Sequence, residues 1–234
     1  MSDPQRNFRI ENGVFELFPA LQIAVMVFNG IDNSDGGRAA MLQAACSALR
    51  ETLAHSDTLP PHIDAYSQAM KQIKRKKGCL ASIEAMAKRL KKGDDIKSIN
   101  PAVDIYNAVS LGHLIPCGGE DLDCIHGDMV LGFARGDEHF VALGDEENTP
   151  PREGELIYRD DDGAVVRSWL WREAERTKIT HRARNIVLYM ELVDAARQAE
   201  LALAMNALQQ TIVRELGGQA VTAILNRTAP ACAI

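Results

Sequence analysis

One stretch near the middle of the chain combines glycines with acidic residues in a pattern suited to a binding pocket. Cys117, Gly118 and Gly119 are followed by Glu120, Asp121 and Asp123. Two adjacent glycines let the backbone turn sharply or approach a ligand closely. Acidic side chains beside them supply hydrogen-bond acceptors. We therefore expect a glycine-rich bend and an acidic loop in the wall of a pocket, whose occupant these residues alone do not identify.

A second feature is a basic segment at residues 71–92, in a chain whose net charge is −6. Against one acid, Glu84, it carries the basic residues Lys71, Lys74, Arg75, Lys76, Lys77, Lys88, Arg89, Lys91 and Lys92. Such a segment either contacts a phosphate backbone or forms two solvated helix faces, and charge alone favours the solvated faces. If RNA is bound, the candidate contacts are Lys74, Arg75, Lys88 and Arg89.

Patterns typical of other chemistries are weak. Cys117, Cys124 and His126 have a spacing that fits no standard zinc site. The chain has no GxSxG nucleophile elbow and no P-loop, and Gly132 and Gly136 do not belong to a dinucleotide fingerprint. We expect no metal, no nucleotide and no other cofactor.

The pocket residues need a helix before them and a strand after them. Asn100 is a good N-cap and Pro101 suits the first helical position, so a helix is expected to begin there. Its apolar face recurs at helical spacing and ends near Gly112. After the acidic residues, the alternating run at 129–133 predicts a strand.

The remaining segments predict a mixture of α and β structure. We expect strands at residues 14–18, 21–28, 139–144 and 184–192, and a hairpin formed by 155–159 and 164–171 around the turn at 160–163. We expect helices at residues 38–54, from Pro60 into the basic segment, at 82–92, and from a cap at Asp194 to Gly217.

Composition is that of an ordinary globular protein. The 234 residues are 46% hydrophobic and 25% charged, and no window approaches the roughly 20 apolar residues of a membrane span. Residues 1–13 lack the apolar core of a signal peptide, and five scattered cysteines do not suggest a disulfide framework. We expect a cytoplasmic protein without membrane contact, with residues 1–234 forming one domain.

Several ordered segments resemble one known family. The runs INPAVDIYNAVSL, LIPCGGEDLD and IHGDMVLGFARG within residues 99–136 are similar to the tRNA-binding and editing domain of the phenylalanyl-tRNA synthetase beta chain, in its free-standing form. Residues 79–93, 154–180 and 183–192 extend the resemblance to about residues 15–225. It implies an α+β fold with mixed and antiparallel sheets flanked by helices, without the catalytic core of the synthetase.

The resemblance also implies a function, the hydrolysis of mischarged tRNA that removes tyrosine from the phenylalanine tRNA. An aminoacyl ester is already activated, so such a site must place a water, orient the terminal ribose and stabilise an oxyanion. Glu173 occupies the position of the family glutamate that reads the tyrosine hydroxyl, and Asn107 is the second catalytic candidate. Gly118, Gly119, Asp121, Thr177 and Thr180 match positions that line the substrate pocket. The expected partner is tRNA, and not DNA.

At one point the sequence departs from the family pattern. Gly118 and Gly119 stand where the synthetase has a histidine followed by a small residue. Two functions therefore remain open: a deacylase that acts in trans on mischarged tRNA, and a module that binds RNA or a small ligand without hydrolysis.

Each candidate also has a purely structural alternative. Asn107 could bond a neighbouring loop, Asp121 could cap a turn, and Glu173 could form an ion pair with Arg172 or Arg176. Thr177 and Thr180 could be ordinary strand or cap residues, while Trp169 and Trp171 are expected in the core or at its rim.

Overall fold

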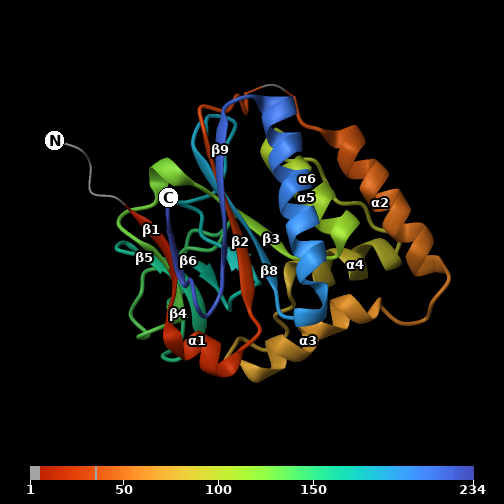
Figure 1. Ribbon diagram of the computed structural model, residues 1–234. Helices are drawn as coiled ribbons and strands as arrows, with labels where there is room; N and C mark the ends of the chain where they lie inside the picture. Colours follow the sequence, from red (N-terminus) through yellow and green to blue (C-terminus); the bar gives the residue numbers. More distant parts are fainter. Residues whose placement is uncertain (1–5, 35) are drawn as a thin grey trace.

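The structure is a computed structural model that describes residues 6–34 and 36–234 (Figure 1). Residues 1–5, which belong to the stretch where we expect no signal peptide, lie outside the described residues. In the described ranges the fold is α+β, with two sheets and flanking helices, as predicted. No helix in these ranges is long and apolar enough to cross a membrane.

The larger sheet is mixed and has the strand order β10-β1-β4-β5-β6-β7. Strand β1 runs parallel to β4, whereas the other neighbouring pairs are antiparallel. The strand bounds are β1 Asn7–Ile10, β4 Met129–Phe133, β5 Leu156–Asp160, β6 Gly163–Arg167, β7 Arg172–Glu173 and β10 Ala231–Ala233.

The smaller sheet is antiparallel, with the order β3-β8-β2-β9. Its strands are β2 Gln22–Asn29, β3 Cys117–Asp121, β8 Ile186–Leu192 and β9 Gln219–Leu225. The helices are α1 Asn12–Leu17, α2 Ala39–Ala54, α3 Pro61–Gln72, α4 Ser82–Lys91, α5 Pro101–His113 and α6 Gln198–Leu216.

The smaller sheet forms the middle layer of the molecule, as β2 demonstrates. Because side chains alternate along a strand, β2 presents Ile23 and Val25 to one core and Met26 and Phe28 to the other. The first core lies against the larger sheet, and the second lies under α5 and α6. A strand buried on both faces explains why residues 21–28 are apolar without a polar alternation.

Most predicted elements are found, and the exceptions have local causes. Of residues 14–18, predicted as a strand, residues 14–17 belong to α1 and Phe18 is its C-cap, whose amide donates to the Val14 carbonyl at 2.8 Å across one helical turn. A short apolar run cannot be assigned by periodicity alone. Residues 139–144 do not form the predicted strand and have only bridge pairings at Val141 and Ala142.

The hairpin strand predicted at 164–171 ends early, at Arg167. Ser168 and Trp169 adopt positive φ angles of 50° and 58°, which no strand accommodates. Asp194 caps a short 3₁₀ turn at Ala195–Arg197 that leads into α6, so the predicted cap stands one turn before the long helix.

The predicted glycine bend is a straight strand instead. Gly118 and Gly119 lie inside β3, paired with Tyr189 and Leu188 of β8. A Cβ on Gly118 would lie 2.6 Å from Tyr189 Cε2, and one on Gly119 would lie 2.4 Å from Leu188 Cδ2. The glycines therefore admit side chains of the neighbouring strand, and the acidic residues Glu120 and Asp121 continue the strand instead of forming a loop.

We predict that Gly118→Ala destabilises the protein by about 1–3 kcal/mol, because the new methyl group overlaps the packed Tyr189 ring. Gly112→Ala is the matched control. A Cβ at that helical position meets nothing within 4 Å, so this variant is expected to gain up to about 1 kcal/mol. Urea unfolding measures both, and equal stabilities of the two variants would contradict the prediction.

Candidate functional site

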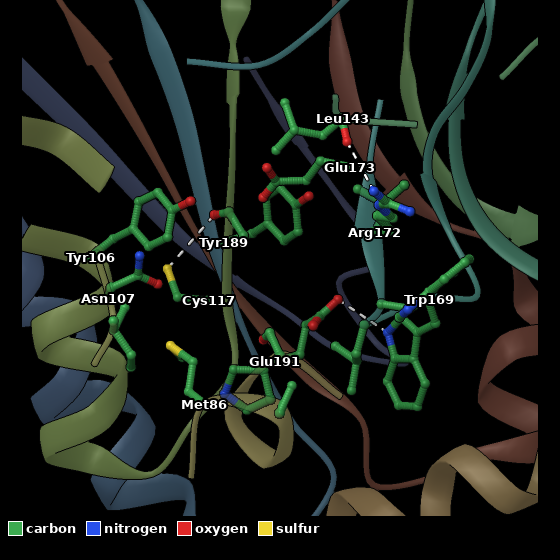
Figure 2. A pocket seen from close by; sticks show the side chains of 18 of the residues that line it. Met86, Tyr106, Asn107, Cys117, Leu143, Trp169, Arg172, Glu173, Tyr189 and Glu191 are labelled. Atoms are coloured by element: carbon green, nitrogen blue, oxygen red, sulfur yellow. Dashed lines mark hydrogen bonds between the residues drawn. The ribbon is translucent and has the colours of Figure 1, made fainter. Parts of the chain in front are cut away.

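A cavity of about 310 Å³ lies among α4, α5, β3, β7 and β8 (Figure 2). It brings together Asn107 from α5, Gly118 from β3 and Glu173 from β7. These three residues, far apart in the sequence, are the ones that the resemblance places in one pocket. The walls are largely apolar and aromatic, and include Met86, Ile96, Tyr106, Pro116, Leu170 and Trp171.

Glu173 is half-buried at this cavity and has no ion-pair partner among the described residues. The neighbouring cations are engaged elsewhere, since Arg172 pairs with Asp145 at 3.4 Å and Arg176 with Asp160 at 2.5 Å. Burial raises the pKa of Glu173 to about 7, and a hydrogen bond with the Gly119 main chain partly offsets this rise. The surface ion-pair alternative is thus wrong, and the carboxyl titrates where a general base is useful.

Asn107 lines the cavity from the middle of α5. Its amide has no hydrogen-bond partner within the ranges that the structure describes, so the bond to a neighbouring loop is not found there. A half-buried amide of this kind retains both donor and acceptor capacity for a ligand.

A second carboxyl, that of Glu120 within β3, interacts with Glu173. Glu120 is fully buried and accepts a hydrogen bond of 3.0 Å from the Tyr189 hydroxyl. Burial and the charge of Glu173 raise the pKa of Glu120 well above its usual value. The hydroxyl of the buried Thr177 lies beside Glu120 and favours its charged form. Thr177 thus supports the Glu120 carboxyl and does not line the cavity.

The other predicted substrate-binding residues lie away from the cavity. A Cβ on Gly119 would meet Leu188 and Ile179 and not the cavity, and Gly119 contacts Glu173 only through its main chain. Asp121 accepts from the Asp123 amide at 3.2 Å and so caps a turn. Thr180 accepts from the Arg182 amide at 3.2 Å, also as a cap.

Sequence reasoning gave no role to Glu191, which also lines the cavity. Its side chain is 1% exposed, and its Oε1 accepts from Trp169 Nε1 at 3.1 Å and from the Tyr158 hydroxyl. Burial raises the pKa of Glu191 to about 8, and these two hydrogen bonds oppose the rise. The sequence does contain one indication of a role for Glu191, because it is the single charged residue within the otherwise apolar run 186–192. An unpaired acid is rarely buried without a reason.

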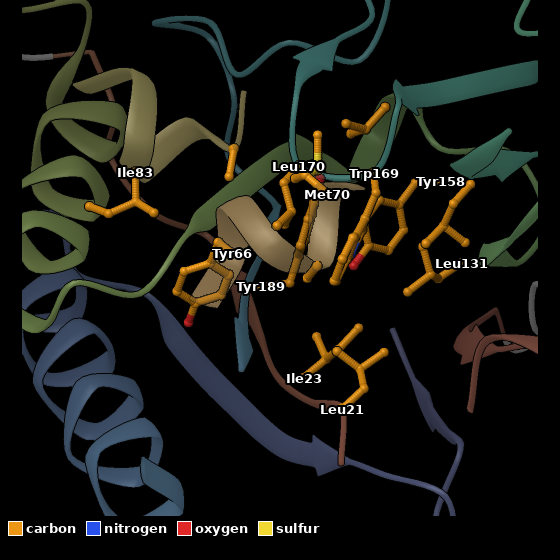
Figure 3. Close-up of a cluster of buried hydrophobic side chains, with 14 of the residues drawn as sticks. Leu21, Ile23, Tyr66, Met70, Ile83, Leu131, Tyr158, Trp169, Leu170 and Tyr189 are labelled. Carbon is orange, nitrogen blue, oxygen red and sulfur yellow. The ribbon is translucent and has the colours of Figure 1, made fainter. Parts of the chain in front are cut away.

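The aromatic residues around Glu191 form one packed group (Figure 3). The rings of Tyr158 and Tyr189 are 4.8 Å apart, and Trp169 stacks on Phe18 at the same separation. Trp169 is buried, whereas Trp171 is partly exposed at the rim, where Lys76 Nζ lies 5.8 Å from the ring centroid. The prediction that the two tryptophans belong to the core or rim is therefore confirmed.

A buried clamp holds the unusual backbone at Trp169. Glu155 accepts from Arg167 Nε at 3.0 Å and from Ser168 Oγ at 2.7 Å. Ser168 and Trp169 both have positive φ, a costly conformation for residues other than glycine. The clamp fixes this turn, which directs the Trp169 indole toward Glu191 and carries the chain to Glu173.

The predicted RNA contacts divide into two kinds. Arg75 donates to the Met70 and Cys79 carbonyls at 2.6 and 2.8 Å, and Arg89 to the Asp95 carbonyl at 3.1 Å, so both hold loops together. Lys74 donates to the Glu153 carbonyl and Lys88 pairs with Glu84, both from exposed positions. Arg89 also lines the cavity.

Cys117, Cys124 and His126 do not converge. Cys117 lines the cavity, whereas His126 pairs with Asp162 beside a separate polar cleft. Within the described ranges there is no group of three side chains that could hold a metal ion.

One comparison with known proteins identifies the family of the chain. The model of the B3/4 domain, which is found in the phenylalanyl-tRNA synthetase beta chain, matches residues 65–229, well over half of the sequence. The chain belongs to the B3/4 domain family. The resemblance drawn from the sequence motifs is thereby confirmed.

Solved structures were also compared with this B3/4 domain. One match is an N-terminal fragment of the phenylalanyl-tRNA synthetase beta-subunit from Pyrococcus horikoshii, at 12% identity and a TM-score of 0.47. The match covers 94% of this chain and 56% of the fragment. The comparison with curated proteins gives no match.

The pKa shifts in this B3/4 domain predict an unusual pH dependence of stability. Folded Glu191 keeps its proton up to a pH of about 8, whereas the unfolded chain releases it near 4.5. The folded state therefore loses stability relative to the unfolded state as pH rises through this interval, by about 1.4 kcal/mol per pH unit for one group.

Glu191→Gln removes this contribution. Its free energy of unfolding, relative to wild type, should rise between pH 5 and pH 8 and then level off, as measured by urea unfolding at a series of pH values. The control Glu16→Gln, at an exposed residue, should show no such trend. A constant difference for Glu191→Gln across this range would show that Glu191 titrates normally.

Proposed function

We propose that this protein is a free-standing aminoacyl-tRNA deacylase, which hydrolyses the ester of a mischarged phenylalanine tRNA in trans. The observation that carries the proposal is the convergence of Asn107, Gly118 and Glu173 on one cavity. The relationship to the phenylalanyl-tRNA synthetase beta chain gives the class of substrate. In this proposal residues 1–234 act as one domain, and the reaction takes place in the cytoplasm with the charged tRNA as partner.

The chemistry requires little beyond positioning, because the ester is already activated. The Glu173 carboxyl, with a pKa of about 7, is suited to take a proton from an attacking water. The same carboxylate can accept a hydrogen bond from a tyrosyl hydroxyl, a contact that favours tyrosine over phenylalanine. The unpaired amide of Asn107 is suited to bind the terminal ribose or the developing oxyanion.

The size of the cavity limits what enters it. A volume of about 310 Å³ is at the lower end for ligand pockets and suits an amino-acid side chain, but not a nucleotide. The phosphates of the tRNA would then remain outside, near Arg89, Arg172 and Lys76. Cations at this rim can neutralise phosphates without entering the site.

We expect Glu173→Gln to lower kcat/KM for deacylation of tyrosylated phenylalanine tRNA by about 100-fold or more, since general-base catalysis contributes factors of this order. Asn107→Ala should cause a comparable loss. The control Glu175→Gln changes a nearby acid that pairs with Lys178, and it should retain activity. Release of labelled amino acid from charged tRNA measures all three.

The same assay separates the two roles of Glu173. A loss confined to tyrosyl-tRNA indicates recognition of the hydroxyl, and an equal loss with phenylalanyl-tRNA indicates a general base. Tight binding of tRNA without turnover by the wild-type protein would contradict the deacylase and leave a binding module.

We expect the exposed lysines to contribute to tRNA affinity. Lys74→Gln with Lys88→Gln should weaken binding to charged and uncharged tRNA equally and lower the slope of log affinity against log salt by about 1–2. Arg75 and Arg89 are left unchanged, because they support loops. Arg214→Gln, on α6 outside the basic segment, is the control. Unchanged affinity and slope in the double variant would remove the basic segment from the tRNA interface.

A further inference from the structure

The interior of the cavity carries carboxyls, while the two arginines that line it, Arg89 and Arg172, have partners elsewhere. Glu173 and Glu191 line the cavity, and Glu120 of β3 lies close enough to Glu173 for their charges to interact. Among the described residues, none of these three carboxyls forms an ion pair. Buried carboxyls in proteins are normally paired with a cation or held neutral at a considerable cost. A cationic group that entered the cavity would supply the missing counter-charge and favour the ionised form of these carboxyls.

Glu191 is the most enclosed of the two carboxyls that reach the cavity, and neutral donors fix its position. Trp169 Nε1 and the Tyr158 hydroxyl both bind Oε1, while the Tyr66 hydroxyl donates to the main-chain carbonyl of Glu191 at 3.0 Å. Figure 2 shows the Glu191 carboxyl bound to the Trp169 indole, with Glu173 in the same view. These contacts hold the carboxyl in place without neutralising it.

The groups facing Glu191 from the surrounding elements are uncharged or acidic. They are Cys117 of β3, Tyr158 of β5, Glu173 of β7 and Tyr189 of its own strand. The charges of Glu191 and Glu173 both act on the Cys117 thiol and raise its pKa, so this thiol lies within reach of both carboxyls.

The arginines at the rim do not compensate these acids. Arg89 donates to the Asp95 carbonyl at 3.1 Å, and Arg172 donates to the Leu143 carbonyl at 3.1 Å and pairs with Asp145. The cavity is thus acidic inside and basic at its mouth. A ligand that complements this arrangement carries a positive charge at its buried end and negative charges outside.

We propose that Glu191 binds a primary ammonium group of the ligand, and so selects amines among ligands of similar size and shape. The inference rests on the proposed function, because it takes an aminoacyl group as the occupant of the cavity. An aminoacyl ester can present a primary ammonium in two ways, as its α-ammonium or as an amine in its side chain. A charged hydrogen bond formed away from water favours the amine over its neutral analogue by about tenfold or more.

Three small probes test the inference without tRNA. The parent compound is 3-phenylpropan-1-ol. Phenylalaninol adds an α-amine, and 3-[4-(aminomethyl)phenyl]propan-1-ol adds an amine at the far end of the ring. Binding is measured by calorimetry at millimolar probe concentrations, with the fluorescence of Trp169 and Trp171 as a second readout.

At pH 8.5 we expect one of the two amines to bind at least about tenfold more tightly than the parent, and the preferred amine identifies the source. The advantage should shrink as pH falls below about 8, because protonated Glu191 must first release its proton. The parent should show no such dependence. Equal affinities of all three probes, or no binding of any of them, would overturn the inference using the wild-type protein alone.

Glu191→Gln keeps the shape of the side chain and an acceptor for Trp169 and Tyr158. It should reduce the ratio of amine affinity to parent affinity to less than about threefold. Glu16→Gln should retain the full advantage. A Glu191→Gln variant that is folded by circular dichroism and still prefers the amine tenfold would overturn the assignment to Glu191.

The binding and deacylation assays together distinguish a failure of the ammonium site from a failure of the proposed deacylase activity. Deacylation without a preference for amines would remove the ammonium site and leave the proposed function intact. A preference for amines without deacylation would remove the proposed function, and the cavity would remain a site for amine ligands.

Discussion

The arrangement of the site depends on one buried contact, in which Trp169 and Tyr158 donate to the Glu191 carboxyl. Glu191 belongs to β8 in the smaller sheet, Tyr158 belongs to β5 in the larger sheet, and Trp169 follows β6. The contact therefore ties the two sheets together at the level of the cavity. Without these donors the buried carboxyl would lose both of its side-chain hydrogen bonds, and a buried acceptor left unsatisfied is costly.

The unusual backbone around Trp169 places its indole within hydrogen-bond distance of Glu191. A tryptophan with positive φ is strained, and the strain persists only where surrounding contacts determine the conformation. Glu155 supplies these contacts through Arg167 and Ser168, all of them buried. The turn directs the indole toward Glu191 and leads into β7, which carries Glu173. The strained backbone at Trp169 therefore holds the indole that binds Glu191, one of the unpaired acids in the cavity wall.

The glycines of β3 have a packing role that bears on the chemistry. They leave room for the Tyr189 ring, whose hydroxyl donates to Glu120, and burial together with the charge of Glu173 raises the pKa of Glu120. A side chain at position 118 would push against this ring. In this protein the space beside position 118 is filled from the neighbouring strand.

The sequence by itself determined the elements whose signals are local. Helix α5 begins where Asn100 accepts from the Val103 amide, and the turn at 160–163 joins two strands, because caps and turns act within a few residues. The α+β class and the pairing of Asn107 with Glu173 followed from resemblance. Tertiary structure alone decided that residues 14–18 form a helix, that Gly118 and Gly119 are straight, and that Glu191 meets a tryptophan 22 positions away. These outcomes depend on contacts between distant segments, which no local pattern contains.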